Sequence, residues 1–141
     1  MEVKFTVPGE PKGKGRPKFA RRGQYVQTYT PDATTNYENL VKLEYERQCG
    51  RISFPKDAQL DMRIMAYFSI PKSKSKKAKQ LMKDKVIRPT KKPDMDNIVK
   101  IIADGLNGIA YHDDSQIVDT AVRKFYSENP RVVVTISEVK T

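Results

Sequence analysis

The sequence has few of the residues that disulfide frameworks and soft metal sites require. Its 141 residues include one cysteine, Cys49, one histidine, His112, and no tryptophan. A single cysteine excludes an intrachain disulfide, and one cysteine with one histidine excludes a multi-cysteine or multi-histidine zinc site. Any metal ion bound here must therefore be held mainly by oxygen atoms.

Long apolar runs and targeting patterns are also missing. No stretch approaches the ~18 consecutive apolar residues of a membrane span, and the start, Met1 to Lys4, lacks the basic and then apolar layout of a signal peptide. We expect a soluble cytoplasmic protein that binds no membrane. The length fits one domain, residues 1–141, whose 38% of hydrophobic residues can form a modest core.

Charge is abundant and unevenly distributed. The 27 Lys and Arg against 17 Asp and Glu give a net charge of +10, which is typical of proteins that bind polyanions such as nucleic acids. Residues 71–92 carry ten basic residues and one Asp, whereas residues 93–119 carry six Asp and one Lys. Clustered aspartates repel a phosphate backbone, so they give no advantage to a protein that only binds phosphate. The acidic cluster therefore indicates a bound cation.

Alternation of apolar and polar residues predicts four strands. The longest alternating run, Leu60 to Ile70, is bounded by Pro55 and Pro71, and we expect it to be a central strand. The last two strands are expected to form a hairpin closed by residues 127–130. The four expected strands cover residues 2–8, 59–70, 116–126 and 131–138.

Two main helices are expected near residues 31–49 and 95–107, where apolar residues recur at helical spacing. A short basic helix is expected within residues 72–85. Residues 9–30 are rich in glycine, proline and basic residues, which favours a mobile loop or ribbon. The predicted fold class is α+β, with a mixed β-sheet packed by the two main helices.

The helix expected over residues 95–107 has two distinct faces. At about 100° per residue, its isoleucines and leucine lie together on one side. Asp96, Lys100 and Asp104 form a row on the other side, at i, i+4 and i+8. Asp94 lies just ahead of them at the N-terminus, where the helix dipole favours anions. Three carboxylates and an ammonium group are therefore close together before any tertiary contact is assumed.

A second acidic pair, Asp113-Asp114, begins the next strand, and the connection after residue 106 is long enough to bring it beside the helix. Clustered carboxylates without histidine or cysteine suit Mg²⁺, which is typically held by one or two carboxylates with water and phosphate oxygens. Such a metal lowers the pKa of a bound water and neutralises charge on a scissile phosphate. Lys100 would stabilise the transition state or the leaving oxygen, or place the attacking water. The pattern favours phosphodiester hydrolysis.

Simpler interpretations of the same residues are open at this point. Asp94 alone is typical of a helix cap. The row from Asp96 to Asp104 is typical of a solvated helix face with i, i+4 ion pairs. Asp113-Asp114 alone is typical of a turn.

Beside a carboxylate site, we interpret the basic residues as phosphate contacts rather than as solvated surface charge. The candidates for nucleic-acid binding are Lys12, Lys14, Arg16, Lys18, Arg21, Arg22, Lys72, Lys74, Lys76, Lys77, Lys91 and Lys92. No P-loop or dinucleotide-binding fingerprint is present, so no nucleotide cofactor is implied. Phe19, Tyr25 and Tyr29 lie near these residues and are suited to stacking on bases, but we favour core or loop packing for each.

Several segments together resemble the RusA family of Holliday junction resolvases, in particular its phage and prophage members. They are KPDMDNIVK (residues 92–100), DGLNG (104–108) and DDSQI (113–117), together with PGEPKGKGRP (8–17) and TYTP (28–31). The resemblance spans nearly the whole chain, and the combined aspartate and lysine pattern is far more specific than any of its parts.

The resemblance implies a homodimeric endonuclease that depends on Mg²⁺, with Mn²⁺ as a substitute metal. Such an enzyme resolves four-way DNA junctions by paired symmetric nicks during recombination and repair, in the cytoplasm of a bacterial or phage-infected cell. Carried over residue by residue, catalysis falls to Asp94, Asp96, Lys100 and Asp114. Metal binding falls to Asp94, Asp96, Asp114 and Asp113, and the spacing leaves open whether Asp113 or Asp114 faces the metal.

Two other functions are compatible with the same residues. A nuclease that acts on flaps or other branched DNA would have the same site. A junction-binding module without catalysis would bind equally well with or without Mg²⁺ and would never cut, but the aspartate cluster argues against it.

The basic stretch after the central strand gives a first prediction. We predict that Lys76→Ala with Lys77→Ala weakens DNA binding and flattens its dependence on salt. With fewer phosphate contacts, the variant releases fewer counterions from the DNA when it binds. Measurement of the dissociation constant over a range of salt concentrations tests this. An unchanged salt slope would assign both lysines to solvent.

Overall fold

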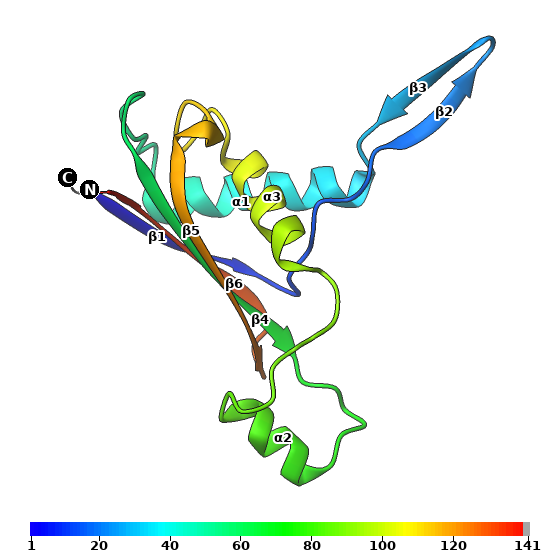
Figure 1. Cartoon of the computed structure of the whole chain (residues 1–141), viewed down its shortest axis with the longest axis vertical. Helices are drawn as coiled ribbons and strands as arrows, with labels where there is room; N and C mark the ends of the chain where they lie inside the picture. The colour runs from blue at the N-terminus through cyan, green and yellow to red at the C-terminus, as the bar shows by residue number, and fades with distance from the viewer. Residues whose placement is uncertain (140–141) are drawn as a thin grey trace.

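A computed structural model describes residues 1–139, except the side chain of Arg22 (Figure 1). This part of the chain has the expected α+β architecture, with a mixed sheet and helices packed on it. The elements in chain order are β1 (Glu2–Pro8), β2 (Lys18–Arg22), β3 (Tyr25–Tyr29), α1 (Asp32–Cys49), β4 (Leu60–Ser69), α2 (Lys76–Lys83), α3 (Met95–Leu106), the 3₁₀ turn η1 (Asp114–Gln116), β5 (Ile117–Ser127) and β6 (Arg131–Glu138).

The main sheet has the strand order β1-β6-β4-β5. β4 pairs in parallel with β5 and antiparallel with β6, while β6 also pairs antiparallel with β1. β4 is therefore a central strand, as its long apolar alternation predicts. Leu60, Ile64 and Phe68 on this strand are at most 2% exposed.

The expected hairpin between the last two strands is wrong. β5 and β6 are consecutive in the chain, but β4 lies between them in the sheet, so residues 127–130 cross the end of β4. The connection from β4 to β5 passes through α2 and α3, and such a crossover returns the chain parallel to the strand it left. The turn residues indicate where the chain reverses, but they do not specify which strand lies beside it.

α1 and α3 cover one face of the sheet (Figure 1). The covered face of α3 consists of Ile98, Ile101, Ile102, Ala103, Gly105 and Leu106, which are all buried. The polar side of α3 faces away from this core, as the helical spacing predicts. No helix of the described part is both long and apolar enough to cross a membrane.

The short basic helix expected within residues 72–85 is α2, Lys76–Lys83. Its N-cap residue is Ser75, whose side-chain oxygen accepts a hydrogen bond from the Ala78 backbone N–H at 3.2 Å. Its Met82 is buried, while Lys76 and Lys77 are exposed. α2 lies at the opposite end of the sheet from η1 (Figure 1).

Residues 9–17 bring the chain from β1 to the ribbon β2–β3 and pass against α3. A side chain at Gly13 would place its Cβ 2.8 Å from the Cβ of Pro93 and 3.1 Å from the Cβ of Asn97. The next residue, Lys14, donates its backbone N–H to the Asn97 carbonyl at 3.0 Å. Glycine is therefore required for this close approach of backbone to helix.

We predict that Gly13→Ala lowers the free energy of unfolding by ~1–3 kcal/mol, since the rigid ring of Pro93 cannot move aside and the segment must shift. Lys12→Ala, at the exposed neighbouring position, is the matched control and is expected to change stability little. Urea unfolding measures both variants. Equal unfolding midpoints would contradict the close packing of residues 9–17 on α3.

Candidate active site

A hollow of about 490 Å³ lies between α3 and the start of β5. It collects polar side chains from two segments that are separate in the sequence. Its lining residues are Asp96, Val99, Lys100, Ala103, Asp104, Asp114, Ile117 and Thr120. The structure thus brings Asp96, Lys100 and Asp114 together, as the sequence analysis expects. We call this cavity the carboxylate hollow.

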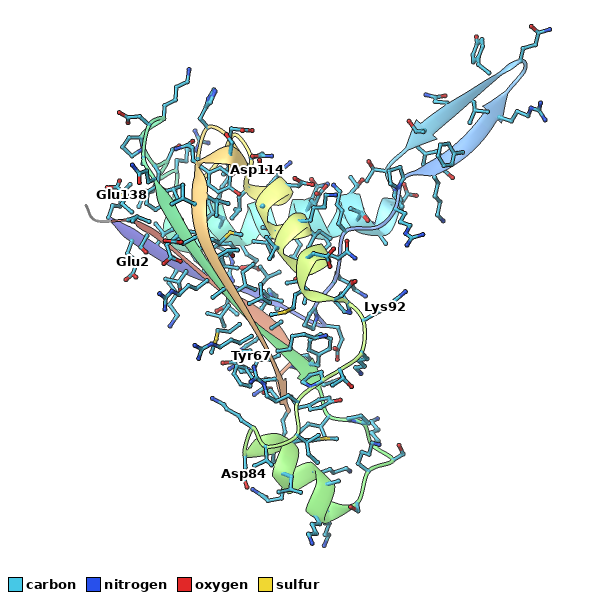
Figure 2. All side chains as sticks on the ribbon, in the orientation of Figure 1. Glu2, Tyr67, Asp84, Lys92, Asp114 and Glu138 are labelled. Carbon is cyan, nitrogen blue, oxygen red and sulfur yellow. The ribbon has the colours of Figure 1, made fainter. Side chains whose placement is uncertain are left out.

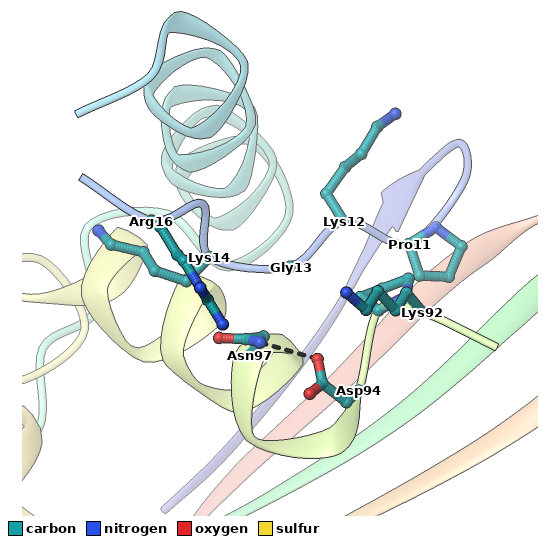
Figure 3. A pocket seen from close by; sticks show the side chains of 9 residues that line it. Pro11, Lys12, Gly13, Lys14, Arg16, Lys92, Asp94 and Asn97 are labelled. Carbon is teal, nitrogen blue, oxygen red and sulfur yellow. Dashed lines mark hydrogen bonds between the residues drawn. The ribbon is translucent and has the colours of Figure 1, made fainter. Parts of the chain in front are cut away.

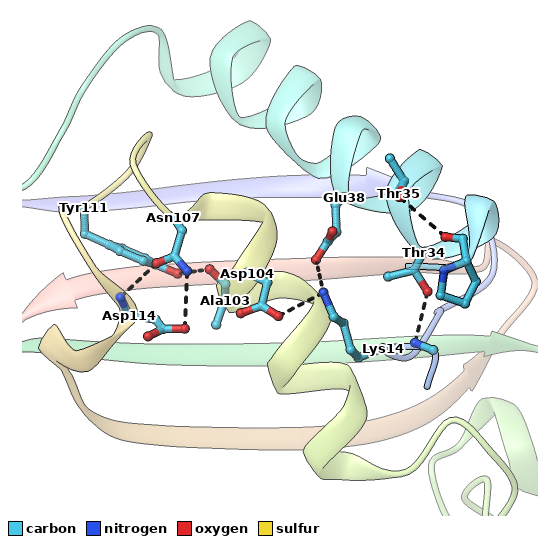
Figure 4. A network of polar contacts seen from close by, with 11 residues as sticks. Lys14, Thr34, Thr35, Glu38, Ala103, Asp104, Asn107, Tyr111 and Asp114 are labelled. Atoms are coloured by element: carbon cyan, nitrogen blue, oxygen red, sulfur yellow. Dashed lines mark hydrogen bonds and ion pairs between the residues drawn. The ribbon is translucent and has the colours of Figure 1, made fainter. Parts of the chain in front are cut away.

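Asp114 is held in place by Asn107, the residue that follows α3. The Asn107 side-chain oxygen accepts a hydrogen bond from the Asp114 backbone N–H at 2.9 Å. The Asn107 amide nitrogen donates to Asp114 Oδ2 at 3.4 Å (Figure 4). Asn107 therefore connects the end of α3 to the start of β5 and directs the Asp114 carboxylate. Sequence reasoning assigned no role to Asn107.

Asp113 has a different place. Its Oδ2 accepts a hydrogen bond from the Ser115 backbone N–H at 3.2 Å, which caps η1. Hydrogen bonding to the side chain and backbone of Ser115 holds the pKa of Asp113 below its usual value. Gln116 completes this capping box, because its Oε1 accepts from the backbone N–H of Asp113. Of the two adjacent aspartates, Asp114 lines the carboxylate hollow and Asp113 caps the turn.

Gln116 also fixes where β5 begins. Its amide nitrogen donates to the Pro55 carbonyl at 2.9 Å and to the Ala58 carbonyl at 3.1 Å. Immediately after this point the register of β5 against β4 shifts by one residue, between Leu60 and Asp61. Such an irregularity redirects side chains locally. The beginning of β5 is therefore tied to the loop that precedes β4, independently of α3.

Asp94 lies at the N-terminus of α3 and lines a second hollow. This hollow, of about 650 Å³, is lined by Pro11, Lys12, Gly13, Lys14, Arg16, Lys92, Pro93, Asp94 and Asn97 (Figure 3). We call it the basic hollow. Lys92 and Asp114 lie near opposite ends of α3 in Figure 2. The two hollows therefore share α3 as a common wall.

The Asp94 side chain does not cap the helix. It makes no side-chain hydrogen bond to the helix backbone, and its Oδ1 instead accepts from the Asn97 amide nitrogen at 2.7 Å (Figure 3). This hydrogen bond and the nearby charge of Lys92 hold the pKa of Asp94 below its usual value. The interpretation of Asp94 as only a cap is therefore wrong, and the exposed carboxylate is directed by Asn97.

Lys14 neutralises one carboxylate of the cluster. Its Nζ lies 2.9 Å from Glu38 Oε2 on α1 and 3.1 Å from Asp104 Oδ2 on α3 (Figure 4). Burial lowers the pKa of Lys14, but the two carboxylates outweigh this effect and the pKa lies above its usual value. Asp104 is therefore paired across elements rather than with Lys100, which takes part in none of the ion pairs among the described residues.

The other basic candidates for nucleic-acid binding fall into separate groups. Lys12, Arg16 and Lys92 line the basic hollow with Asp94. Lys18 and Arg21 are exposed on the ribbon β2–β3, where the side chain of Arg22 lies outside the described part. Lys72, Lys74, Lys76 and Lys77 are exposed around the start of α2, and Lys91 is exposed near Phe68.

Lys124 on β5 is a cation near the site that sequence reasoning missed. Its Nζ donates to the Lys91 carbonyl at 2.5 Å and lies 5.1 Å from the centre of the Phe68 ring. Burial lowers the pKa of Lys124, while the negative charge of Asp94 opposes this shift. Its register partner on β4, Ala66, is fully buried. The signal available in the sequence was that Lys124 alternates with Val122 and Tyr126 and so occupies an apolar position of the strand.

Whether a metal ion fits this site depends on the oxygen ligands that the side chains offer, because no complete set of protein ligands is already assembled in the part of the chain that the structure describes. Among the described residues, no three His, Cys, Asp or Glu side chains are grouped so that they could hold a metal ion. Mg²⁺ needs only one or two carboxylates when water and phosphate oxygens complete its shell. Asp96 and Asp114 line one hollow, and neither takes part in an ion pair among the described residues. Their chemistry fits a hard cation.

The comparison with protein families agrees with the residues gathered here. The family model described as Endodeoxyribonuclease RusA matches residues 8–137, which include both hollows and the ribbon. The chain belongs to the RusA endodeoxyribonuclease family.

Two curated relatives cover most of the chain. It is 41% identical over 139 residues to "Uncharacterized protein YqaN" of Bacillus subtilis (strain 168), covering 97% of this chain and 96% of that protein. It is 30% identical over 115 residues to "Crossover junction endodeoxyribonuclease rusA" of Lactococcus phage r1t, covering 81% of this chain and 79% of that protein.

The different places of Asp113 and Asp114 give a matched prediction. We predict that Asp114→Asn weakens Mn²⁺ binding about tenfold or more, because it removes a charged oxygen from the carboxylate hollow. Asp113→Asn removes the same charge one residue away and keeps an oxygen that can accept from Ser115, so binding is expected to change little. Calorimetric titration of each protein with Mn²⁺ measures both. A larger loss in Asp113→Asn would reverse the assignment.

Proposed function

We propose that the chain is a Mg²⁺-dependent endonuclease that resolves Holliday junctions, cutting symmetrically paired strands of a four-way DNA junction. The observation that carries the proposal is the carboxylate hollow, in which Asp96, Asp114 and Lys100 lie together beside a basic hollow that contains Asp94. Membership of the RusA family and the name of the phage relative support the same activity.

Asp96 and Asp114 are the residues that would hold Mg²⁺, with Asp94 as a further carboxylate at the end of the same helix. When bound, the metal would supply an activated water and neutralise charge on the scissile phosphate. Asn97 and Asn107 keep the carboxylates Asp94 and Asp114 oriented. An amide is neutral, so each asparagine orients a carboxylate without forming an ion pair with it.

Lys100 is the cationic side chain of the carboxylate hollow. It is exposed and forms no ion pair with a described residue, so its ammonium group is available to a phosphate oxygen. A fixed positive charge that meets the developing negative charge stabilises the transition state. We assign Lys100 to that role, or to the departing oxygen.

The phosphate backbone of DNA would contact the basic residues that lie beside the acidic site. Lys12, Arg16 and Lys92 line the hollow next to Asp94, and they offset the repulsion between aspartates and phosphates. Contacts of this kind position the backbone and carry no sequence information. The site is thus arranged for recognition of DNA shape at the phosphates.

We further propose that the enzyme acts as a homodimer. Two copies related by a two-fold axis present two identical sites, which suits a substrate that needs two symmetric cuts. A nuclease for flaps would not need this symmetry.

The proposal predicts that wild-type protein nicks a labelled four-way junction at paired positions with Mg²⁺ and not with EDTA. Asp96→Asn is expected to reduce cleavage by about 10²-fold or more, because it removes a charged group from the reaction site. Its junction binding is expected to stay equal or become tighter, since it also removes a charge that repels phosphate.

Asp119→Asn is the matched control, since it removes a charge from the same acidic stretch at an exposed position outside the hollow. A linear duplex of the same sequence and a flap substrate are assayed in parallel. Nicking by Asp96→Asn at the wild-type rate would defeat the site assignment. Preference for the flap would favour the flap nuclease, and tight binding without any cutting would favour a binding module.

A further inference from the structure

The ribbon β2–β3 stands apart from the body of the protein. Each strand has five residues, and Figure 1 shows the ribbon projecting beyond the end of α1, away from the sheet. We call β2, β3 and their turn, residues 18–29, the arm. A lone two-stranded ribbon is at best marginally stable in water, so an arm of this kind gains from a binding partner.

The arm exposes large apolar side chains. Phe19 is 71% exposed, Tyr25 74%, Val26 61% and Tyr29 47%. The expectation that Phe19, Tyr25 and Tyr29 pack in the core or against loops is therefore wrong. Exposed aromatic groups gathered on one projection are typical of an interaction surface.

The charge of the arm and of the segment that leads to it, residues 11–17, favours nucleic acid as the partner. Residues 11–29 contain six basic residues and no acidic residue. This segment is complementary to a polyanion and is repelled by a chain whose net charge is also positive. We therefore infer that the arm binds DNA, and the alternative to be tested is that it binds a second copy of the chain.

The arrangement on the two faces of the arm fits DNA better than a protein surface. Across the two strands, Lys18 pairs with Tyr29 and Phe19 with Thr28, while Arg21 pairs with Val26. Paired residues share a face, so each face of the arm mixes an aromatic and a basic side chain. Aromatic rings beside basic groups form platforms on which unpaired bases stack while the backbone is neutralised.

The base of the arm is fastened next to the site. Gly15 donates its backbone N–H to Oγ1 of the buried Thr34 on α1 at 3.0 Å, and the backbone N–H of Lys14 donates to the Asn97 carbonyl on α3. Asn97 is the residue that orients Asp94. DNA held by the arm would thus lie in a set relation to the N-terminus of α3.

We propose that the arm enters the open centre of a branched DNA and stacks Phe19, Tyr25 and Tyr29 on bases that are unpaired there. The inference rests on the proposed function and extends it, because it names the element that distinguishes a junction from a linear duplex. A duplex hides its base faces in the helical stack and offers the arm only phosphates. Each stack of a base on an aromatic ring contributes roughly 5- to 150-fold to affinity.

The test is equilibrium binding of the full chain to a four-way junction and to a linear duplex of the same sequence, in EDTA at one fixed salt concentration. For Phe19→Ala with Tyr25→Ala and Tyr29→Ala, we expect junction affinity to fall at least tenfold and duplex affinity to fall less than threefold. The three side chains are exposed, so the melting temperature is expected to stay unchanged.

Two further variants separate stacking from charge. Tyr25→Phe with Tyr29→Phe keeps both rings and is expected to keep the junction preference. Lys18→Ala with Arg21→Ala is expected to weaken binding to both DNAs by similar factors and to reduce the salt slope. If the aromatic triple variant keeps the wild-type ratio of junction to duplex affinity, the proposal is wrong.

Analytical ultracentrifugation of the same proteins tests whether the arm binds a second copy of the chain. If the triple variant changes the association state and keeps the preference for junctions, the arm binds a second copy and the proposal fails. Wild-type cleavage is assayed separately, so the two failures can be told apart. A wild-type protein that cuts no DNA overturns the proposed function, whereas a cutting enzyme with an arm-independent preference overturns only this inference.

Discussion

The burial of one face of α3 is the constraint on which the site depends. Ile98, Ile101 and Leu106 are fully buried, and burying each such side chain contributes ~1.5–3 kcal/mol. At Gly105 an added Cβ would lie 3.3 Å from the Cβ of Val41, so α1 and α3 approach closely at this point. Rotation of α3 about its axis would expose these residues, and its rotation is therefore fixed. The polar row that carries Asp96 and Lys100 faces β5 as a consequence.

The acidic residues around α3 have different partners. Lys14 pairs with Asp104, and two asparagines at opposite ends of α3 hold the other key acids: Asn97 holds Asp94 and Asn107 holds Asp114. An amide that donates to a carboxylate orients it without neutralising it. In the carboxylate hollow, Asp96 and Asp114 take part in no ion pair among the described residues, while the adjoining hollow is lined by Lys12, Lys14, Arg16 and Lys92. This separation allows one surface to attract both a hard cation and a phosphate backbone.

The features that could be predicted from the sequence are those that depend on local periodicity. The two faces of α3, the central place of β4 and the approach of Asp114 to the helix all follow from spacing and from the length of the connection. Strand order is decided by long-range pairing, which local periodicity does not show. For this reason β5 was expected beside β6, whereas it lies beside β4. The partner of Asp104 comes from residue 14, ninety residues away, and no helical spacing reveals it. Phe19, Tyr25 and Tyr29 were expected to pack in the core or against loops, but the ribbon that carries them projects from the body and leaves all three exposed.

Crystals of the protein soaked in Mn²⁺ would show directly whether the carboxylate hollow is a metal centre. We predict an anomalous scattering peak between Asp96 and Asp114 in the wild type, and its loss in Asp96→Asn crystals of the same form. A peak bound elsewhere in the molecule, or a hollow that stays empty at Mn²⁺ concentrations that support cleavage, would contradict the assignment of catalysis to these carboxylates.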